Sequence, residues 1–484
     1  MNRVAQLLLP AIGWDPHRGY DAAQEGIGRA LALGVGGFVL HGGEQDAVRA
    51  LAKQLRHRSS VPLLIGAELE RGAGQQFAGA TGLPPLAAIA ALNDVDALRR
   101  AARLTAREAR TLGVNWAYAP VVDLDLLPDN AVTGSRSLGA DPQRVGALAS
   151  EWVDACQSEG VLACAKHFPG HGRAGAHSRT PVPVVNASKQ ELMDTDLVPF
   201  RSAIAAGVAS IMTAHVAYPA LDPSGAPATT SREMLRWLLR QQLNFDRLIV
   251  SDALALDAPS GAEEDEGALA VRALNAGCDL LLCPRDVAGV ARALERALHA
   301  RELDADRVNR SVRRRLKWAQ WASPPNEYRK PSATDVVWGA QLADRVVHMV
   351  RGMPPRLHSP LDVLVVDDDE DGAIPVPARE PFLTALREAG WAVRPVQAPT
   401  NEPGRSLVIA LFGEVHSWKG RAGYSLATRN AVEWACAAAP GALVVQFGPP
   451  RLVAEIPFAR AVLSTWGGDS AMQQAAARWL VRER

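Results

Sequence analysis

The chain has 484 residues, with 52 basic and 52 acidic residues and 48% hydrophobic residues. Its length exceeds that of most single domains, so two domains are expected. Because the net charge is zero, no overall field attracts nucleic acid or an anionic membrane, and neither is predicted as a partner. The five cysteines have no metal-like spacing, and their odd number favours reduced thiols over a disulfide framework.

Three absences narrow the class of protein further. No apolar run reaches the roughly 18 residues that a membrane-spanning helix needs. Residues 1–10 contain one Arg and a short apolar run, which favours a first strand over an export signal. No GxGxxG sequence connects a strand to a helix, so no dinucleotide is predicted, and no other cofactor or metal is either. We therefore expect a soluble, cytoplasmic protein.

The first two thirds of the chain alternate short apolar runs with longer amphipathic stretches. Near-continuous apolar strands between helices are typical of a parallel sheet that is covered on both faces. About eight such units predict an α/β protein with a (β/α)8 TIM-type barrel, and an open doubly wound sheet is the alternative. The expected strands are 7–9, 34–40, 61–66, 114–122, 160–165, 210–214, 248–250 and 280–282; the expected helices are 44–56, 97–112, 142–158, 188–206, 231–242, 264–276 and a pair within 287–321.

The pattern is interrupted and then begins again. Residues 322–332 contain three prolines and mixed charges, which predicts a linker, and a helix over 333–351 is expected to follow. The sequence therefore predicts a barrel domain (1–321), a linker with a bridging helix (322–357) and a smaller α/β sandwich domain (358–484). The strands expected after the linker are 362–366, 407–411, 442–446 and 461–463, and the helices are 381–389, 425–438 and 470–480.

Six motifs follow the predicted strands of the first domain. They are AELERG (67–72), LGVNWAYAPVVD (112–123), GSRSLGADP (134–142), KHFPGHG (166–172), TAHVAYP (213–219) and VSDAL (250–254). In this order they resemble glycoside hydrolase family 3, on its β-N-acetylglucosaminidase side. The resemblance covers residues 5–320 strongly and the rest loosely. It implies a TIM barrel and a small carbohydrate as the substrate.

Asp252 is the predicted catalytic nucleophile. Retaining glycoside hydrolysis needs a carboxylate that attacks the anomeric carbon. Asp252 follows the predicted strand 248–250, at the end of a barrel where active sites form. An isolated Ser–Asp pair favours a helix N-cap instead, but the resemblance places Asp252 on the nucleophile of the family.

The resemblance also implies a set of sugar-binding residues. Lys166 and His167 fall on the pair that binds hydroxyls of the sugar in the −1 subsite, and Arg136 falls on a second binding position, with a surface salt bridge as its alternative. A dry pocket must provide a fixed polar partner for each sugar hydroxyl. Glu68 stands where the family has an Asp, so the identity of the sugar stays open. Glu70 either assists Glu68 or is a structural partner of Arg136.

The expected general acid/base departs from the family pattern. His177-Ser178-Arg179 stands where these enzymes carry Asp-Ser-His. Arginine does not release a proton near neutral pH. His177 has a suitable unperturbed pKa near 6.5, although it lies two residues early, up to about 7 Å of extended chain. We predict His177 as the acid/base; the alternatives are a carboxylate of the second domain, such as Glu414, or no efficient acid.

The sequence thus predicts an exo-acting, retaining β-N-acetylglucosaminidase that acts on small carbohydrates such as cell-wall fragments, as in peptidoglycan recycling. One alternative is a family member that binds a sugar without turning it over. The other is a β-glucosidase or phosphorylase-like variant with a different acid/base. The oligomeric state is not defined by the sequence.

Overall fold

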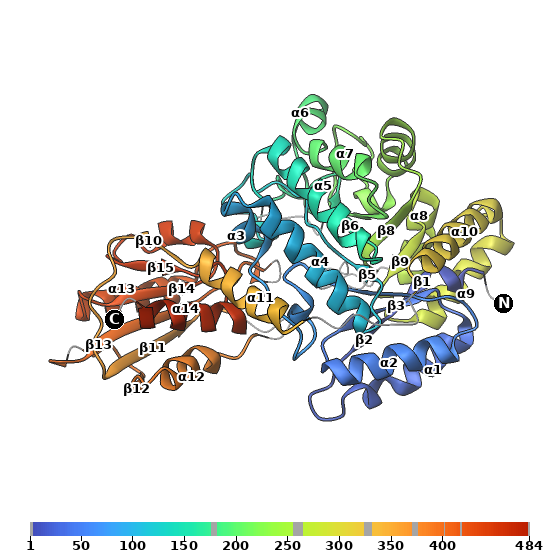
Figure 1. Cartoon of the computed structure of the whole chain (residues 1–484). Coiled ribbons are helices and arrows are strands. Elements are labelled where there is room, and N and C mark those ends of the chain that lie inside the picture. The colour runs from blue at the N-terminus through green and yellow to red at the C-terminus, as the bar shows by residue number, and fades with distance from the viewer. Residues whose placement is uncertain are drawn as a thin grey trace.

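The structure is a computed structural model that describes residues 3–175, 182–254, 265–323, 332–369, 376–400, 402–416 and 419–482. The chain is a mixed α/β protein with parallel sheets. Two of these sheets lie in the N-terminal part (residues 3–323), and a third lies beside them in the C-terminal part (residues 332–482) (Figure 1). No helix in these ranges is long and apolar enough to cross a membrane.

The N-terminal part contains two all-parallel sheets, with strand orders β1-β9-β8-β7-β6 and β2-β3-β4-β5. Only Pro10 separates β1 from β2. On the other side, Trp116 in β5 and Leu162 before β6 form a parallel bridge. The two sheets are therefore connected at both ends. The strands are β1 (Leu8–Leu9), β2 (Ala11–Gly13), β3 (Gly37–His41), β4 (Leu64–Ala67), β5 (Trp116–Ala117), β6 (Cys164–Phe168), β7 (Ser210–Thr213), β8 (Leu248–Ala253) and β9 (Leu280–Leu282).

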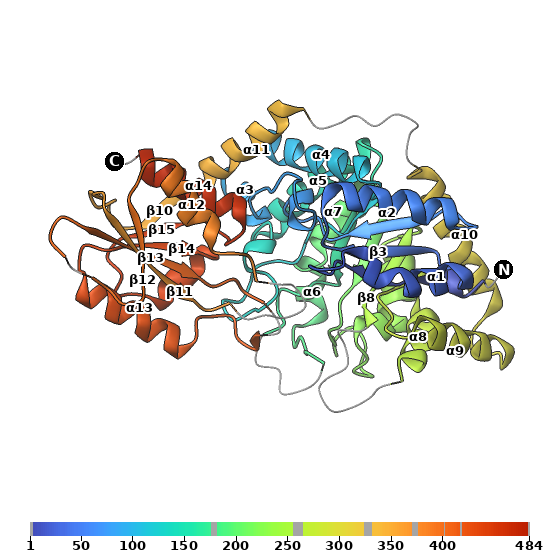
Figure 2. The ribbon, with the colours of Figure 1, turned by 90° about the horizontal axis from the view of Figure 1, so that it is seen from below.

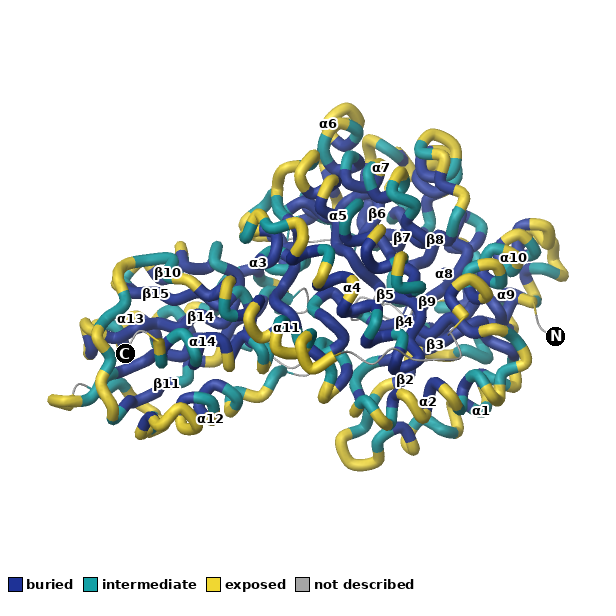
Figure 3. Tube along the Cα trace, viewed as in Figure 1, coloured by how far each residue is buried: buried dark blue, intermediate teal, exposed yellow. Residues whose placement is uncertain are grey.

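Helices cover the outside of these strands (Figures 1 and 2). In α2, the residues Val48, Leu51, Ala52 and Leu55 are buried, which is the spacing of one helix face. The strands form the buried centre, and the exposed residues lie on the outer helices and on the connecting loops (Figure 3). The helices are α1 (Gln24–Leu33), α2 (Gln45–Arg58), α3 (Leu86–Ala91), α4 (Val95–Thr111), α5 (Pro142–Ser158), α6 (Lys189–Asp194), α7 (Val198–Ala205), a π-helical segment (Glu233–Gln242), α8 (Glu266–Ala276), α9 (Val287–His299) and α10 (Ala305–Trp321).

The C-terminal part is built on one sheet with the order β10-β15-β14-β13-β11-β12, parallel except for the β10–β15 pair. Alternate residues of the strands contribute to two separate hydrophobic cores, because successive side chains point to opposite faces of the sheet. One core packs against α11, α12 and α14, and the other against α13. The elements are α11 (Ala333–Val346), β10 (His348–Arg351), β11 (Leu361–Asp367), α12 (Glu380–Glu388), β12 (Val393–Val396), β13 (Ser406–Phe412), α13 (Leu426–Ala438), β14 (Leu443–Phe447), β15 (Val462–Ser464) and α14 (Ser470–Arg482).

Several predicted elements differ in their bounds. The helix expected over 188–206 is two helices, α6 and α7, and Pro199 lies in the first turn of α7, where proline is favoured. The helix expected over 333–351 ends at Val346, and His348–Arg351 forms β10. Strand β12 was not predicted; it contains Pro395, which is tolerated because β12 is an edge strand. Most of the predicted linker, residues 324–331, lies outside the described ranges.

Candidate active site

The predicted site residues gather at the carboxyl ends of β4, β6 and β8. Glu68 directly follows β4, Lys166 and His167 lie within β6, and Asp252 lies near the end of β8. The sequence had predicted that β6 ends before Lys166 and that β8 ends before Asp252, and both strands continue three residues further than expected. Each strand shifts its register where these residues stand: between Ala165 and Phe168 in β6, and between Val250 and Ala253 in β8. Such irregularities re-aim side chains and are frequent beside active sites.

Lys166 is the centre of a buried ionic network. Its side chain is fully buried, and Nζ lies 3.2 Å from Oε1 of Glu68 and 2.7 Å from Oε1 of Glu70. Arg136 donates two further hydrogen bonds to Glu70, from Nε to Oε2 (2.9 Å) and from one terminal nitrogen to Oε1 (2.8 Å). Glu70 is therefore the structural partner of Arg136 that the sequence had left as one of two options, and it also holds Lys166.

The charges of this network stabilise one another. Burial alone would raise the pKa of Glu70, but Arg136 and Lys166 outweigh it and hold that pKa well below its usual range. The Lys166 ammonium likewise lowers the pKa of Glu68. Burial would lower the pKa of Lys166, yet the two glutamates raise it above its ordinary value. All four side chains are thus charged at neutral pH, and the 31% exposed side chains of Glu68 and Arg136 are the members that solvent reaches.

Asp123 holds the second half of the site. It is almost fully buried, and its Oδ2 lies 2.7 Å from Nδ1 of His167. Its Oδ1 accepts hydrogen bonds from the backbone N–H groups of His167 (3.0 Å) and His171 (2.7 Å). The rings of the two histidines lie edge to face, 6.0 Å between centroids. Asp123 therefore fixes the orientation of His167 and the start of the loop that carries His171.

Asp252 lies within electrostatic reach of two imidazoles, those of His215 and His171. Burial lowers the pKa of His215 to about 4, and the Asp252 carboxylate opposes that shift. Burial also lowers the pKa of His171, with Asp123 and, more weakly, Asp252 acting against it. The Asp252 carboxylate accepts a hydrogen bond from the backbone N–H of Ala253 at 2.8 Å. Half-buried and at a strand end, Asp252 has a position that suits a nucleophile.

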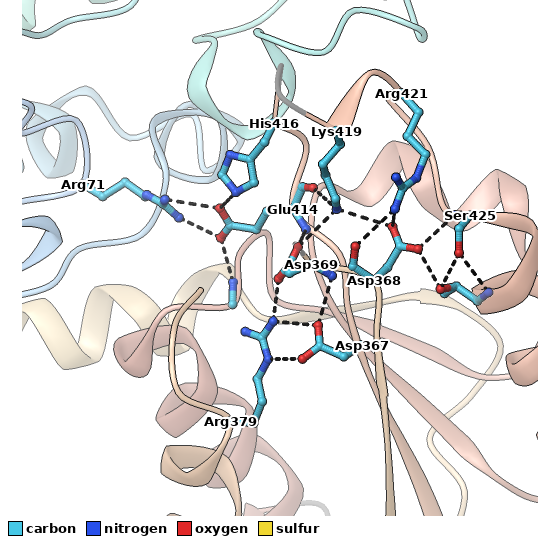
Figure 4. Close-up of polar contacts among 12 residues, drawn as sticks. Arg71, Asp367, Asp368, Asp369, Arg379, Glu414, His416, Lys419, Arg421 and Ser425 are labelled. Atoms are coloured by element: carbon cyan, nitrogen blue, oxygen red, sulfur yellow. Dashed lines mark hydrogen bonds and ion pairs between the residues drawn. The ribbon is translucent and has the colours of Figure 1, made fainter. Parts of the chain in front are cut away.

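Glu414, the predicted alternative acid, is engaged in an ion pair with the N-terminal part. Arg71 donates to its Oε1 at 2.9 Å and to its Oε2 at 3.3 Å (Figure 4). Burial would raise the pKa of Glu414, but Arg71 outweighs it and lowers that pKa to about 2. A carboxyl group with this pKa is ionised at neutral pH, so Glu414 is not suited to donate a proton as a general acid.

The structure brings Glu68 and Lys166 into direct contact and connects Arg136 to Lys166 through Glu70, whereas His177 lies outside the described residues. Sequence reasoning did not single out Asp123 or the Arg71–Glu414 pair. The signal for Asp123 was its place at the end of the LGVNWAYAPVVD motif; the signal for the ion pair was absent, because its members are 343 residues apart. Within the described ranges, no three His, Cys, Asp or Glu side chains are arranged to hold a metal ion.

The fold and this site define a class: α/β proteins with parallel strands whose carboxyl ends carry paired carboxylates, a buried lysine and imidazoles. Residues 2–317 match the model described as "Glycosyl hydrolase family 3 N terminal domain". The match covers well over half of the chain, and the chain belongs to glycosyl hydrolase family 3.

Named relatives carry the comparison further. A protein from Cellulomonas fimi named β-N-acetylglucosaminidase/β-glucosidase is 39% identical over 264 residues, which are 53% of this chain and 47% of that protein. A β-hexosaminidase from Idiomarina loihiensis is 35% identical over 273 residues, which are 55% of this chain and 81% of that protein. The aligned region thus spans about half of the first relative and most of the second.

A solved structure matches the whole chain. The family 3 β-N-acetylglucosaminidase from Paenibacillus sp. str. FPU-7 superposes with a TM-score of 0.84 and covers 100% of this chain and 96% of its own. The sequence identity of 24% means that this likeness concerns the fold. It includes the C-terminal part, which the family model does not cover.

Proposed function

We propose that the protein is a retaining β-N-acetylhexosaminidase that removes terminal N-acetylglucosamine from small carbohydrates such as cell-wall fragments. The observation that carries this proposal is the charged network that includes Glu68, Arg136 and Lys166. The network lies at the carboxyl ends of β4 and β6, and Asp252 lies at the carboxyl end of β8 in the same part of the chain. The names of the family 3 relatives support the choice of sugar.

In this proposal Asp252 is the nucleophile. Its carboxylate attacks the anomeric carbon, the bond to the leaving oxygen breaks, and a covalent glycosyl–enzyme ester forms. Water then attacks the same carbon and releases the sugar and the carboxylate. Glu68, Arg136, Lys166 and His167 bind hydroxyls of the sugar; the charged partners around Lys166 hold its ammonium in place before the sugar arrives, which lowers the cost of binding.

The leaving oxygen needs a proton, and His177 remains the residue we propose for this step. Glu414 is a poor candidate, because its ion pair with Arg71 keeps it ionised. A less efficient enzyme without a dedicated acid, or one whose ester intermediate is resolved by phosphate, would still need Asp252. The assay described below separates these cases.

We further infer a closed (β/α)8 barrel for residues 1–321. The single residue between β1 and β2 and the bridge between β5 and the start of β6 support closure, with β1 and β2 as one interrupted strand. The separate cores of the C-terminal sheet support a second α/β domain over 358–484, with the linker and bridging helix at 322–357.

The test uses p-nitrophenyl β-glycosides of N-acetylglucosamine and of glucose, because an activated leaving group needs little help from an acid. We expect the wild type to release nitrophenol with a burst, and Asp252→Ala to lose at least about 10³-fold in kcat. Peptide mass analysis of quenched enzyme should find the sugar on the peptide that contains Asp252. Asp46→Ala, at a side chain that is 95% exposed on α2, is the control and should match the wild type.

The outcomes discriminate between the hypotheses. Binding of N-acetylglucosamine without release of nitrophenol from either glycoside would refute hydrolysis and favour a sugar-binding protein. Turnover that requires added phosphate would favour a phosphorylase. If His177→Ala slows unactivated substrates no more than activated ones, His177 is not the acid.

A further inference from the structure

Three arginine–carboxylate pairs connect the C-terminal part to the segments that carry Glu70 and Arg136. Arg71 of the N-terminal part binds Glu414 and, at 3.6 Å, also pairs with Asp469, and Arg451 of the C-terminal part binds Asp125. Both arginine contacts lie between Glu70 and Arg136 along the chain: Arg71 is the residue after Glu70, and Asp125 is in the loop that leads to Arg136. Their placement suggests a role in holding that pair.

The first contact is bidentate and buried. Arg71 donates to both carboxylate oxygens of Glu414, and the backbone N–H of Gly468 donates to Oε1 at 3.0 Å. Glu414 is only 7% exposed. A bidentate pair holds the planar guanidinium in a single orientation. Because Arg71 directly follows Glu70, the contact restrains the backbone that presents Glu70 to Lys166.

Glu414 is itself held by its own sheet. Its backbone N–H donates to Oδ1 of Asp369 at 2.7 Å, and Asp369 is paired with Arg379 at 2.7 Å (Figure 4). Lys419 donates to the backbone oxygen of Glu414 at 2.9 Å. These residues follow β11 and β13 and neutralise one another, so Glu414 is a fixed anchor rather than a mobile side chain.

The second contact holds the loop before Arg136. Arg451 donates to Oδ1 of Asp125 at 2.6 Å and to the backbone oxygen of Asn130 at 2.6 Å. The same Oδ1 of Asp125 accepts from the backbone N–H of Gly134 at 3.3 Å. Gly134 begins the short turn Gly134–Arg136. Arg451 thus restrains the turn from which Arg136 reaches Glu70.

We propose that Glu414 and Arg451 are positioning residues: through them, the C-terminal part holds Glu70 and Arg136, and with them Lys166, in the geometry that binds the sugar. Buried ion pairs are weak contributors to stability but are well suited to fix one arrangement. Binding sites lose function when their groups move by as little as about 1 Å. The inference rests on the proposed function for the identity of the ligand only.

The test compares Glu414→Gln and Arg451→Met with Arg345→Met. Arg345 on α11 pairs with Asp94 at the start of α4 at 2.6 Å, so it also joins the two parts but does not adjoin either site segment. Arg71→Lys is a milder variant, since it keeps the charge but loses the bidentate geometry. It replaces Glu414→Gln if that protein does not fold.

The first measurement is amide hydrogen exchange of the unliganded proteins. Peptides that cover residues 68–75 and 130–137 should exchange about 3–10-fold faster in Glu414→Gln and Arg451→Met, respectively, and at the wild-type rate in Arg345→Met, because exchange reports local opening. The second measurement is sugar binding. Both test variants should raise the KM for p-nitrophenyl N-acetyl-β-glucosaminide and the Kd of N-acetylglucosamine about 3–30-fold, with kcat changed less than about threefold.

Equal exchange and equal sugar affinity in the test variants and in Arg345→Met would overturn the proposal. Faster exchange with unchanged sugar affinity would also overturn it, because the segments would move without any effect on the site. If the wild type neither binds nor hydrolyses the sugar while exchange rises only in the test variants, positioning of the segments is supported and the proposed function fails.

Discussion

Asp123 illustrates how one buried carboxylate sets the chemistry of its neighbours. Burial would raise its pKa, but His167 and the hydrogen bonds around it lower that pKa. An ionised carboxylate only accepts hydrogen bonds, so the 2.7 Å contact places the hydrogen of His167 on Nδ1. In the neutral form of the ring, Nε2 is then the nitrogen without a hydrogen and can accept a hydrogen bond.

We predict that Asp123→Asn weakens sugar binding. The amide keeps the shape of the side chain, but it loses one charge-assisted acceptor and leaves His167 free to turn or to change tautomer. The Kd of N-acetylglucosamine, measured by calorimetry, should rise about 10–100-fold, the equivalent of one hydrogen bond to a charged group. Asp129→Asn, at an exposed residue of the same loop, is the matched control. An unchanged Kd in Asp123→Asn would show that Asp123 does not contribute to sugar binding.

At the residue scale, the sequence predicts which side chains gather but not how they pair. The KHFPGHG motif indicated Lys166 and His167 because all of its residues lie in one continuous segment of the sequence. Their partners are distant: Asp123 is 44 residues from His167, and Glu68 is 98 residues from Lys166. Such pairs form only when the strands align, and a single sequence carries no direct signal for that alignment.

At the element scale, helices with clear end signals were predicted most accurately. The helix over 142–158 matches α5 at both ends, and its start is marked by Asp141, which accepts from the backbone N–H of Arg144, and by Pro142 in the first turn. Strand β12 was missed, since Val393-Arg394-Pro395-Val396 has two polar or proline positions and lies at the sheet edge. Edge strands bury little, so their hydrophobic pattern is weak.

Asp362 in β11 holds this edge in place. It is completely buried and accepts from Arg394 of β12 (2.9 and 2.8 Å) and from Arg405 before β13 (3.0 and 2.7 Å). Burial would raise the pKa of Asp362, but these arginines hold it well below its usual range. The pattern of β11 favours a hydrophobic residue at position 362. The aspartate that stands there instead connects β11 to β12 and to the residue before β13 through charged hydrogen bonds.

We predict that Asp362→Asn lowers the free energy of unfolding by about 1–3 kcal/mol, because the buried side chain at position 362 loses its charge-assisted hydrogen bonds from Arg394 and Arg405, which keep Glu402 as a counter-charge. Urea unfolding followed by tryptophan fluorescence and by far-UV circular dichroism should reveal a less stable C-terminal part. The Kd of N-acetylglucosamine should stay within about twofold of the wild-type value, since Asp362 lies in β11 and contacts none of the site residues. A stability equal to that of Glu388→Gln, at an exposed residue of α12, would contradict the prediction.

At the scale of the whole molecule, the contact between the two parts depends on charge and therefore on pH. Arg71 holds the pKa of Glu414 at about 2, below the ordinary value of 4.5. Because the folded pKa is the lower one, the stabilisation is complete above about pH 4.5 and is lost as the pH falls toward 2. The wild type should therefore lose about 1–3 kcal/mol more free energy of unfolding over this range than Glu414→Gln does. The free energy of unfolding of both proteins is measured across this pH range. An equal loss in the wild type and in Glu414→Gln would contradict the prediction.

The relation between the two parts was the least predictable feature. The linker and the second alternating pattern predicted that a second sheet exists, but the contacts that join it to the first involve residues 343 and 326 positions apart. Glu414 had been considered as an acid because it follows a strand. The structure shows the same position used for an ion pair, and no local pattern distinguishes these two roles.

The strand order of the C-terminal sheet has a consequence for the time course of synthesis. Strand β15 lies between β10 and β14, although it is the last of the six strands along the chain. While a ribosome makes the chain, β10 has no neighbour in the sheet until residues 462–464 emerge. All strands of the N-terminal part are made by residue 282, and N-terminal domains fold first during synthesis. The segments that carry Glu70 and Arg136 would then receive their restraint from Glu414 and Arg451 late in translation, after all strands of the N-terminal part have been made.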